Sequence, residues 1–492
     1  METHRGELTR EVVLACIIGS TGGLMFGYDT GIIGEVTSMP SFLEKFFPSV
    51  YKYQEQNVAG TDQFCRFLSF ELAMFISLLY VAALLASIAA SSLTRVFGRR
   101  PSMLIGGTLF LAGAVSNVFA ATDVTILLLG RVLLGFGVGF ANQSAPLYLS
   151  EMAPCKHRGA LNSCFQLCIS IGILAAHHVN YAVKSHKNGW RISLGLAAVP
   201  ALIFITGSLF LPETPHSLIE RGRPEEARRI LRTMRGIHDV DDEFKDLAAA
   251  GFESKNVKDP WINLMQRKYY PQLVFAVVIP YLNQISGVNL IMLYSPVLFK
   301  IIRLRNTSTS WLSYMSRAAN FVFTILSMKS VDKVGRRWMF IQGGIQMFIS
   351  LIIMISIFWK YGVDGNPIIL FVTIFFYVGG FALSWGPLGW LVPSEILPLE
   401  IRSQGHSVNV CMNMFCAFFV VQLFTDVLCS FKLLLFLLLP CSVLFMSLFV
   451  ALLLPETKGV PLEKMADIWK AHLCWNKYFT DEDVHMEGEL GI

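Results

Sequence analysis

A carboxylate within an apolar segment is the residue of this sequence best suited to chemistry. Asp29 lies in the glycine-rich stretch Gly22–Gly31, close to the end of the first apolar run. An ionised side chain inside a membrane is costly unless it is paired or faces a wet cavity, so such residues usually mark substrate or proton pathways. The alternative is that the helix ends at Tyr28 and leaves Asp29 in a loop. The apolar Ile32 and Ile33 that follow argue against this alternative.

Arg131 is a cation that could pair with Asp29. Asp29 lies about four residues before the end of the run 11–33, and Arg131 about seven residues after the start of the run 124–149. If these two helices run in opposite directions, a rise of 1.5 Å per residue places both side chains roughly 6–10 Å below the same membrane edge. Arg131 would hold Asp29 ionised whereas burial would favour its neutral form, and these opposing effects could tune proton uptake.

Composition predicts the elements that must position this pair. The chain has 492 residues, of which 54% are hydrophobic and 15% charged, whereas soluble domains average about 25% charged residues. We therefore predict an all-α membrane protein with twelve transmembrane helices. A mixed-charge leader precedes the first run and is unlike a cleaved signal peptide, so the first helix should stay attached. The charge-poor runs near bilayer length are 11–33, 70–92, 102–122, 124–149, 160–182, 191–212, 272–299, 310–330, 338–358, 366–392, 404–428 and 433–454.

The distribution of Lys and Arg predicts the orientation. With the N-terminus inside, the inner segments hold 27 Lys and Arg residues and the outer segments hold 11. The positive-inside rule then places both termini in the cytoplasm. The net charge of +5 reflects this anchoring and gives no reason to expect a nucleic-acid partner.

Three motifs occur twice, in the same order and at offsets of 237 to 244 residues. The first copies are Gly98-Arg99-Arg100, Ser150-Glu151 and Leu211–Thr214. The second copies are Gly335-Arg336-Arg337, Ser394-Glu395 and Leu454–Thr457. Such parallel repeats are typical of secondary transporters with a site between two halves. We predict a six-helix half at 1–212 with an outer lid segment at 34–69, a cytoplasmic helical linker at 213–270, a second six-helix half at 271–456 and a cytoplasmic tail at 457–492. Pro224 should begin a helix of the linker.

The repeated motifs lie at inner helix ends, where Arg side chains could bridge carboxylates on neighbouring helices. We predict an inner gate in which Glu151 pairs with Arg158 and Glu395 with Arg402, and to which Arg99 and Arg336 belong. The alternative is that these cations are only positive-inside anchors.

Together these motifs closely resemble the sugar porter family of the major facilitator superfamily, and within it the plant sugar transport proteins, which are monosaccharide–proton symporters. The resemblance covers almost the whole chain. It rests on Gly22–Asp29, Gly130–Gly135, Asn142-Gln143, Pro146–Pro154, Gln284–Asn289, Ser384–Trp390 and Pro455–Gly459. It implies a monomer that imports a hexose and protons across the plasma membrane by alternating access, without cofactor or metal. Asp29 would be its proton acceptor and Arg131 the partner of Asp29.

Several amides could bind a sugar, because a carboxamide both donates and accepts hydrogen bonds without carrying charge. Taken singly, such an amide is more often an interhelical contact worth about 0.6 kcal/mol. An aromatic ring could also cover the apolar face of the sugar. The resemblance implies that the sugar-binding residues are Phe26, Gln166, Asn283, Gln284, Asn289, Asn320, Gly386, Trp390 and Asn413.

The resemblance also implies a disulfide between Cys65, in the lid segment, and Cys429, at the outer end of the eleventh helix. The oxidising outer face would permit such a bridge, and the alternative is two free thiols. The other eight cysteines are interpreted as packing residues.

The sequence shows three departures from the family pattern. Asn283 stands where a second Gln is usual, and its shorter side chain could leave a sugar hydroxyl bridged only by water. Arg317 stands where a small residue is usual; it either pairs with Asp426 or impairs transport. Thr30 and Glu35 replace an apolar residue and Gly, which puts the local fit of the lid in question.

The remaining polar features carry weaker predictions. His177 and His178 are expected at the membrane interface rather than as ligands, and Asn306-Thr307-Ser308 is a glycosylation acceptor of uncertain use. The sequence shows no nucleotide loop, metal-ligand spacing or nucleophile–base arrangement. The leading hypothesis is a proton-coupled hexose symporter. The alternatives are a passive hexose facilitator, which Asp29 and Arg131 disfavour, a non-transporting sugar receptor, which only Arg317 favours, and, more remotely, a membrane enzyme.

Overall fold

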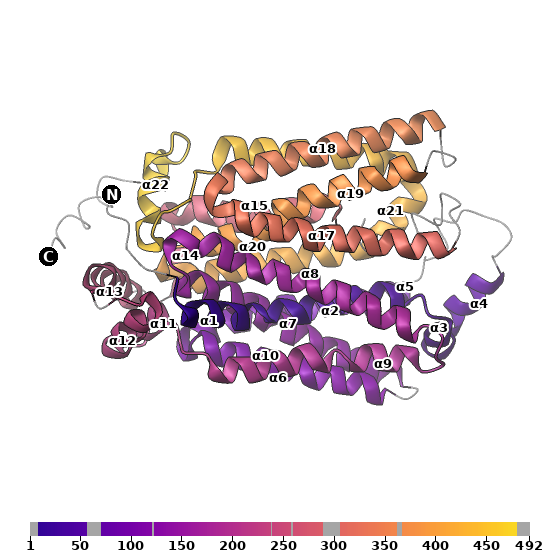
Figure 1. The fold of residues 1–492 in the computed structure, drawn as a ribbon, viewed down its shortest axis with the longest axis horizontal. Coiled ribbons are helices and arrows are strands. Elements are labelled where there is room, and N and C mark those ends of the chain that lie inside the picture. Colours follow the sequence, from indigo (N-terminus) through magenta and orange to yellow (C-terminus); the bar gives the residue numbers. More distant parts are fainter. Residues whose placement is uncertain are drawn as a thin grey trace.

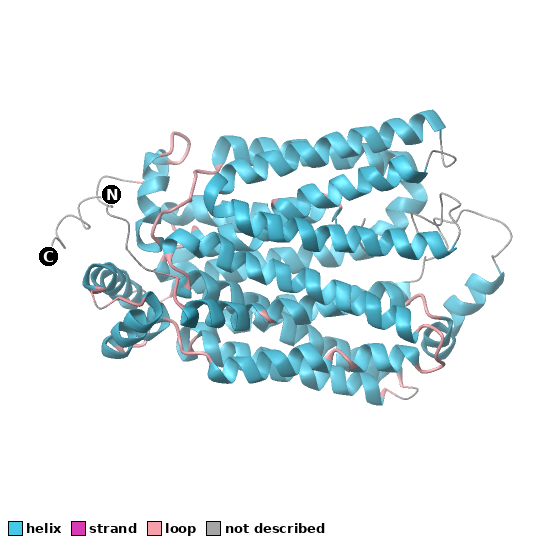
Figure 2. Ribbon diagram, viewed as in Figure 1, coloured by secondary structure: helices cyan, strands magenta, loops and turns pink. Residues whose placement is uncertain are grey.

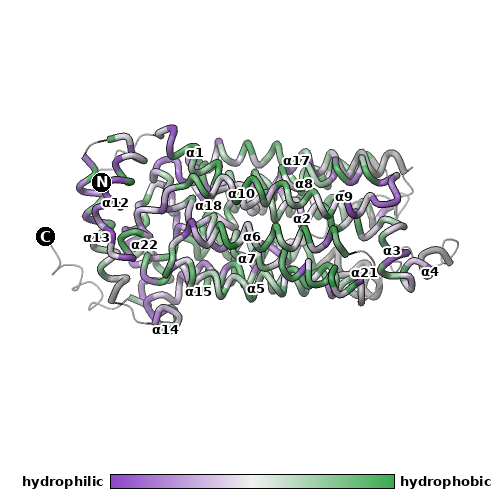
Figure 3. Tube along the Cα trace, turned by 90° about the horizontal axis from the view of Figure 1, so that it is seen from below, coloured by the Kyte–Doolittle hydropathy of each residue, from purple (hydrophilic) through white to green (hydrophobic). Residues whose placement is uncertain are grey.

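The computed structural model describes residues 8–56, 70–120, 123–237, 239–256, 259–288, 306–361 and 367–479. Its regular elements are all helices in these ranges, and most run side by side in one elongated bundle (Figures 1 and 2). Hydrophobic residues follow the length of the bundle, whereas hydrophilic residues gather around α12, α13 and α22 at one end (Figure 3). This is the pattern of an all-α membrane protein, as the composition predicts.

The first half contains the helices α1 (Arg10–Ser20), α2 (Gly22–Val36), α3 (Pro40–Phe46), α4 (Pro48–Gln56), α5 (Phe70–Phe97), α6 (Arg99–Phe119), α7 (Val124–Met152), α8 (Arg158–Val183), α9 (Gly189–Gly195) and α10 (Ala198–Phe210). Only Thr21 separates α1 from α2, so these two form one membrane span. This span continues to Val36, three residues beyond the predicted end. Asp29 is therefore inside a helix, and the alternative of a loop is wrong.

The second half contains α15 (Tyr270–Ile285), α17 (Asn306–Val334), α18 (Arg336–Tyr361), α19 (Pro367–Leu383), α20 (Trp385–Glu395) and α21 (Arg402–Leu453). Each half has its own hydrophobic core, the first drawn almost wholly from residues 12–234 and the second from residues 264–475. Among the described residues, eight helical stretches are long and apolar enough to span a membrane.

The last two predicted spans both lie within α21. A straight helix of 52 residues would be roughly 78 Å long, more than twice the roughly 30 Å core of a bilayer. Its two ends nevertheless lie beside the same segment. Arg402 Nε donates to the carbonyl of Leu397 at 3.0 Å, and Thr457, just after α21, donates to Glu395 at 3.0 Å. The element therefore turns back between its ends and crosses the bundle twice.

The linker forms short helices outside the bundle, namely α11 (Pro215–Glu220), α12 (Pro224–Arg235), α13 (Asp241–Asn256) and α14 (Pro260–Leu264). Pro224 begins α12, as predicted, because its fixed φ suits the first helical position. Gly236 ends the same helix with φ of 66°, a left-handed conformation that favours glycine. The helices α11 to α13 lie at the same end as α22 (Met465–Ala471), which we call the terminal end (Figure 1).

The opposite end carries α3 and α4, and we call it the lid end (Figure 1). Phe42 and Phe46 of α3 pack against the first half. The ring centroids of Phe42 and Phe75 are 5.5 Å apart, and those of Phe46 and Trp190 are 5.1 Å apart. The described part of the predicted lid therefore rests on α5 and α9. Residues 57–69 of the lid lie outside the described residues.

Glycines let α2 approach α8 closely. A methyl group at Gly23 would lie 2.4 Å from the carbonyl oxygen of Phe165, and one at Gly27 would lie 2.1 Å from that of Ile169. Small residues at a spacing of four allow such backbone contact between membrane helices. The glycine-rich stretch thus fixes how α2 is rotated, and it is this rotation that aims Asp29 at its partner.

We expect Gly27→Ala to destabilise the bundle, because the new methyl group meets backbone rather than a side chain that could move. Overpacking of this kind costs about 1–3 kcal/mol. Thermal unfolding of the purified protein in detergent should show a lower midpoint for Gly27→Ala. Gly22→Ala is the matched control, since its methyl group meets the Phe204 ring at 3.1 Å and the Ala145 methyl at 3.5 Å. Equal midpoints for both variants would contradict the close-approach argument.

Candidate functional site

A polar cavity of about 90 Å³ lies between the two halves, inside the bundle. It is large enough for several water molecules. The first half contributes residues of α2, α5 and α8, and the second half contributes residues of α15, α17, α19, α20 and α21. Of the predicted sugar-binding residues, the lining includes Phe26, Gln166, Asn283, Gln284, Asn320, Gly386, Trp390 and Asn413. The ninth, Asn289, lies outside the described residues.

Asp29 and Arg131 come together in the first half, on the neighbouring helices α2 and α7. Arg131 Nη1 donates to Asp29 Oδ1 at 2.6 Å, with Arg131 fully buried and the Asp29 side chain 4% exposed. Among the described residues, Arg131 Nε and Nη2 have no hydrogen-bond acceptor. A single hydrogen bond therefore joins two buried charges, which is a weaker arrangement than the bidentate pair that Arg can form.

The guanidinium of Arg131 has a second contact, with an aromatic ring. Its central carbon lies 4.5 Å from the centroid of Phe75, within the range of a cation–π interaction. Because Phe75 also packs on Phe42, a continuous set of contacts joins the lid helix α3 to the charged pair. The ring gives Arg131 an attractive neighbour that does not depend on the charge of Asp29.

The cavity amides are already partly engaged. Asn320 accepts a hydrogen bond from Ser170 at 2.6 Å, and Gln284 donates to Asn413 at 3.2 Å. Asn283 donates to the carbonyl of Trp385 at 3.0 Å. The shorter side chain, which departs from the family pattern, therefore hydrogen-bonds to the backbone of α20. Each carboxamide has two N–H donors and one acceptor oxygen.

Aromatic rings form one wall of the cavity. Trp390 of α20 meets Phe26 of α2 edge to face, with centroids 6.5 Å apart, and meets Phe165 of α8 at 5.4 Å. These contacts cross from one half of the protein to the other. The cavity thus has the amide groups and the apolar rings that were predicted for a sugar site.

Sequence reasoning missed several of the residues that line the cavity. The structure adds Thr30, Tyr80, Ile169, Ile173, Pro280, Phe381, Gly389, Ala417, Val420 and Val421. A usable signal was present in α8, where Gln166, Ile169 and Ile173 are spaced three and four residues apart and so share one helix face. Most of the others are apolar, and an apolar residue in a membrane helix carries no such signal by its type.

The acidic and basic residues of the repeated motifs meet at the terminal end, but not in the predicted pairs. Arg158 Nε donates to Glu395 at 2.8 Å, and Arg402 Nη1 lies 3.6 Å from Glu151. Each Arg therefore pairs with the carboxylate of the other half. The predicted Glu151–Arg158 and Glu395–Arg402 pairs are wrong, because each Arg side chain extends across the boundary between the halves. The cross-pairing ties the halves together at this end.

Within each half, a second Arg holds the same carboxylate. Arg99 Nη2 donates to Glu151 at 2.8 Å and Arg336 Nη2 to Glu395 at 2.9 Å. The helices that begin with these residues are capped alike, since Glu213 accepts from the backbone N–H of Arg99 at 3.0 Å and Glu456 from that of Arg336 at 2.8 Å. Burial raises the pKa of Glu213, although Arg99 opposes this.

A further contact joins the tail to the linker. Glu463 lies 3.1 Å from Nε2 of His216 in α11. Burial alone would raise the pKa of Glu463, but the hydrogen bond and charge of His216, together with Arg402, lower it to about 2. Glu463 therefore stays ionised at neutral pH and braces the terminal end.

Arg317 belongs to a charged cluster near the lid end. Its Nη1 lies 3.1 Å from Glu35 Oε1 and 2.6 Å from His177 Nδ1, and Glu35 Oε1 lies 2.6 Å from the same nitrogen. Arg317 thus pairs with Glu35, and the predicted pair with Asp426, whose side chain is outside the described part, stays a prediction. His177 is buried in this cluster, whereas His178 is exposed, and their predicted place at the membrane interface stays a prediction.

The structure does not test two of the predictions. Cys65 lies outside the described residues, and the side chain of Cys429 is not described either, so the predicted bridge between them stays a prediction. The eight other cysteines are free thiols. Asn306 begins α17, and its use as a glycosylation acceptor also stays a prediction.

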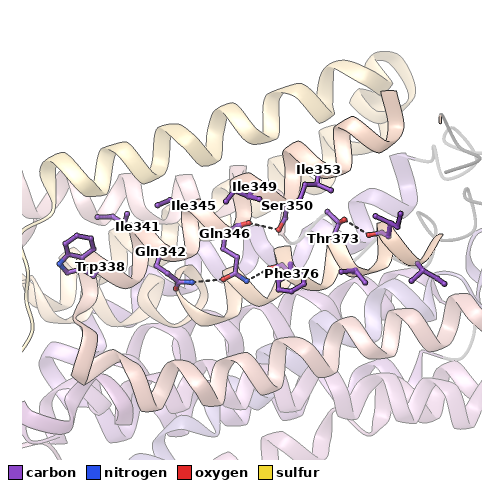
Figure 4. A pocket seen from close by; sticks show the side chains of 13 residues that line it. Trp338, Ile341, Gln342, Ile345, Gln346, Ile349, Ser350, Ile353, Thr373 and Phe376 are labelled. Atoms are coloured by element: carbon purple, nitrogen blue, oxygen red, sulfur yellow. Dashed lines mark hydrogen bonds between the residues drawn. The ribbon is translucent and has the colours of Figure 1, made fainter. Parts of the chain in front are cut away.

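A larger hollow of about 800 Å³ runs along the outer surface of α18 and α19 (Figure 4). It is lined mainly by exposed aliphatic and aromatic side chains, such as Ile345, Ile353 and Trp338. Gln342 and Gln346 hydrogen-bond to each other at 3.0 Å in its floor. Such an apolar surface on a membrane protein faces lipid chains, so this groove is distinct from the polar cavity between the halves.

Known proteins resemble this chain over almost its full length. The family model described as "Sugar (and other) transporter" matches residues 15–469. Sugar carrier protein C of Ricinus communis is 53% identical, covering 100% of this chain and 96% of that protein. Sugar transport protein 1 of Arabidopsis thaliana is 50% identical, again with 100% and 96% covered.

Solved structures share the fold. The proton:xylose symporter XylE bound to 6-bromo-6-deoxy-D-glucose is 24% identical, covers 94% of this chain and 100% of that chain, and superimposes with a TM-score of 0.82. XylE from E. coli in a partially occluded inward open conformation is also 24% identical, with 92% and 100% covered and a TM-score of 0.71.

Proposed function

Because this chain belongs to the family of sugar and other transporters, we propose that it imports a neutral monosaccharide, a glucose-like hexose, together with protons. The observation that carries this proposal is the buried Asp29–Arg131 pair, held by one hydrogen bond of 2.6 Å. Asp29 lies on α2, the helix that also supplies Phe26 and Thr30 to the amide-lined cavity. A passive facilitator would have no need to bury such a pair.

Asp29 acts as the proton acceptor. When it is ionised, Arg131 balances its charge across the single hydrogen bond. A proton taken up on the carboxylate removes this attraction, and Arg131 keeps its contact with the ring of Phe75. The helix α2 is then free to shift against the cavity, to which it contributes Phe26 and Thr30. Protonation and sugar binding are thereby coupled, and each strengthens the other by the same factor.

The sugar lies among the amides of the cavity. Gln166 on one side, and Gln284 and Asn320 on the other, donate to and accept from its hydroxyl groups. Trp390 and Phe26 cover its apolar face. Since these residues come from both halves, a bound sugar is held by both, as alternating access requires.

The terminal end faces the cytoplasm and the lid end faces outward, in the plasma membrane. The distribution of Lys and Arg supports this orientation. The crossed pairs Arg158–Glu395 and Arg402–Glu151 then act as the inner gate, which must separate to release sugar into the cell. The relatives named as sugar transport proteins, and the proton:xylose symporter of the same fold, agree with this assignment.

The receptor alternative loses its one supporting feature. It rested on Arg317 as a cation that would hinder transport, but the described lining of the cavity does not include Arg317. Its charge is balanced by Glu35 instead.

Uptake of radiolabelled glucose into cells that express the chain tests the proposal directly. We expect the cells to concentrate glucose above the medium, and a protonophore to reduce the internal concentration to that of the medium, because the driving force is then lost. Cells carrying an empty vector serve as the control. Uptake that only equilibrates, and that ignores the protonophore, would instead identify a passive facilitator.

A further inference from the structure

We infer that Glu35, His177 and Arg317 form an outer gate, an ionic lock that holds the two halves closed above the sugar cavity. The inference deepens the proposed transport cycle and rests on it. These residues lie on three helices, α2, α8 and α17, of which the first two belong to the first half and the third to the second half. We call them the outer lock.

The outer lock is compact and shielded from water. Its three polar atoms lie within 3.1 Å of one another. The side chains of Arg317, His177 and Glu35 are 7%, 11% and 19% exposed. Tyr314 of α17 stacks on His177, with ring centroids 5.8 Å apart, and covers the imidazole. An ion pair with this little exposure is screened much less than a surface pair.

The outer lock belongs to a seam between α8 and α17 that continues down to the sugar cavity. Ser170 and Asn320 hydrogen-bond across the seam at 2.6 Å. His177 lies seven residues after Ser170 on α8, and Arg317 lies three residues before Asn320 on α17. These spacings correspond to two helical turns and one turn, on the side of the cavity toward the lid end. Sugar that enters from outside must therefore pass between the helices that the lock joins.

Opening the outer side separates α2 and α8 from α17. Glu35 and His177 move together because they belong to the same half, whereas Arg317 moves away with the other. Arg317 then loses its ion pair with Glu35, and Glu35 stays beside His177. A substitution that removes the charge of Arg317 also removes its attraction to Glu35, which exists only in the closed state. The open state therefore becomes more populated.

The lock is the counterpart of the inner gate at the other end. There, Arg158 meets Glu395 and Arg402 lies near Glu151, also across the boundary between the halves. In this structure, ion pairs join the halves on both sides of the cavity. An alternating-access cycle needs two such closures that open in turn. The outer lock provides the closure on the outer side through its charged side chains.

The test measures access to the cavity instead of uptake, so that it stands apart from the test of transport. Thr30, which lines the cavity, is replaced by Cys in the full-length protein in intact cells. Its labelling by a membrane-impermeant maleimide is followed by mass spectrometry of the peptide that contains residue 30. We expect Arg317→Gln and Glu35→Gln each to increase the labelling rate roughly 5- to 150-fold, the range of typical coupling between sites.

Two further variants complete the test. The charge exchange Glu35→Arg with Arg317→Glu should restore slow labelling, because it rebuilds the pair in the opposite sense. Lys329→Gln, which removes an exposed charge from the same helix, should leave the rate unchanged. If Arg317→Gln does not reach the cell surface, the near-isosteric Glu35→Gln decides. Labelling at the parent rate in the single variants, or fast labelling that persists in the exchange variant, would overturn the outer lock.

Discussion

The Asp29→Asn variant is expected to lose accumulation of sugar altogether, while still letting sugar equilibrate. Asn keeps the shape of a protonated Asp29 but exchanges no proton, so the proton gradient can no longer drive transport. A membrane potential of 100 mV supplies about 2.3 kcal/mol per charge, which corresponds to roughly 50-fold accumulation. The internal to external ratio of labelled glucose should therefore fall from tens in the parent to about one.

A control separates lost coupling from lost folding. Glu225→Gln removes an exposed carboxylate from α12 and should accumulate sugar like the parent. Exchange of labelled for unlabelled sugar should also continue in Asp29→Asn, because the cavity is intact. If Asp29→Asn concentrates glucose and a protonophore abolishes that gradient, then another residue is the proton acceptor.

The sequence predicted the depth of the charged pair because charged residues inside apolar runs are rare. Asp29 and Arg131 are recognisable as charged residues within apolar runs. The rise per residue of a helix is enough to predict that both lie at the same depth in the membrane. What the sequence did not show was why they face each other. That depends on how α2 is rotated, and the backbone contacts of Gly23 and Gly27 with α8 set this rotation. A hydropathy pattern measures length and depth but not rotation.

The gates were predicted only in part, for the same reason. The residues of the inner gate were found from their repetition, but Glu151 was paired with Arg158, its neighbour in sequence, whereas the structure pairs it with Arg402 of the other half. Pairing across a boundary between halves depends on tertiary packing, which sequence spacing does not report.

Arg317 shows how a departure from a family pattern can still be informative. The sequence suggests Asp426 as its partner, as one of two alternatives, because both are unusual charges expected near the outer ends of their helices. Its observed partner, Glu35, was unusual too, since it stands where the family commonly has Gly. Two departures of opposite charge on different helices were a signal for a pair, but the predicted end of the first span at residue 33 placed Glu35 outside the helix. In the structure α2 continues to Val36 and carries Glu35 to Arg317.

Gln166→Ala and Gln284→Ala are each expected to weaken sugar binding roughly 5- to 150-fold. Both side chains line the cavity, and one lies in each half. Removing a carboxamide leaves a buried sugar hydroxyl without a partner, at a cost of about 1–3 kcal/mol. The loss should appear mainly in the apparent affinity, since neither residue belongs to the charged pair that takes up the proton. Binding of labelled glucose to purified protein measures it without the need for transport.

The lipid-facing groove provides the matched control for this substitution. Gln342→Ala removes the same group from an exposed position on α18, where it contacts Gln346 instead of the cavity, and should leave glucose affinity unchanged. The effects at Gln166 and Gln284 should also exceed those of an ordinary interhelical amide contact, which averages about 0.6 kcal/mol, or less than threefold. Parent-like affinity in both cavity variants would mean that these amides only join helices, and that the sugar binds elsewhere between the halves.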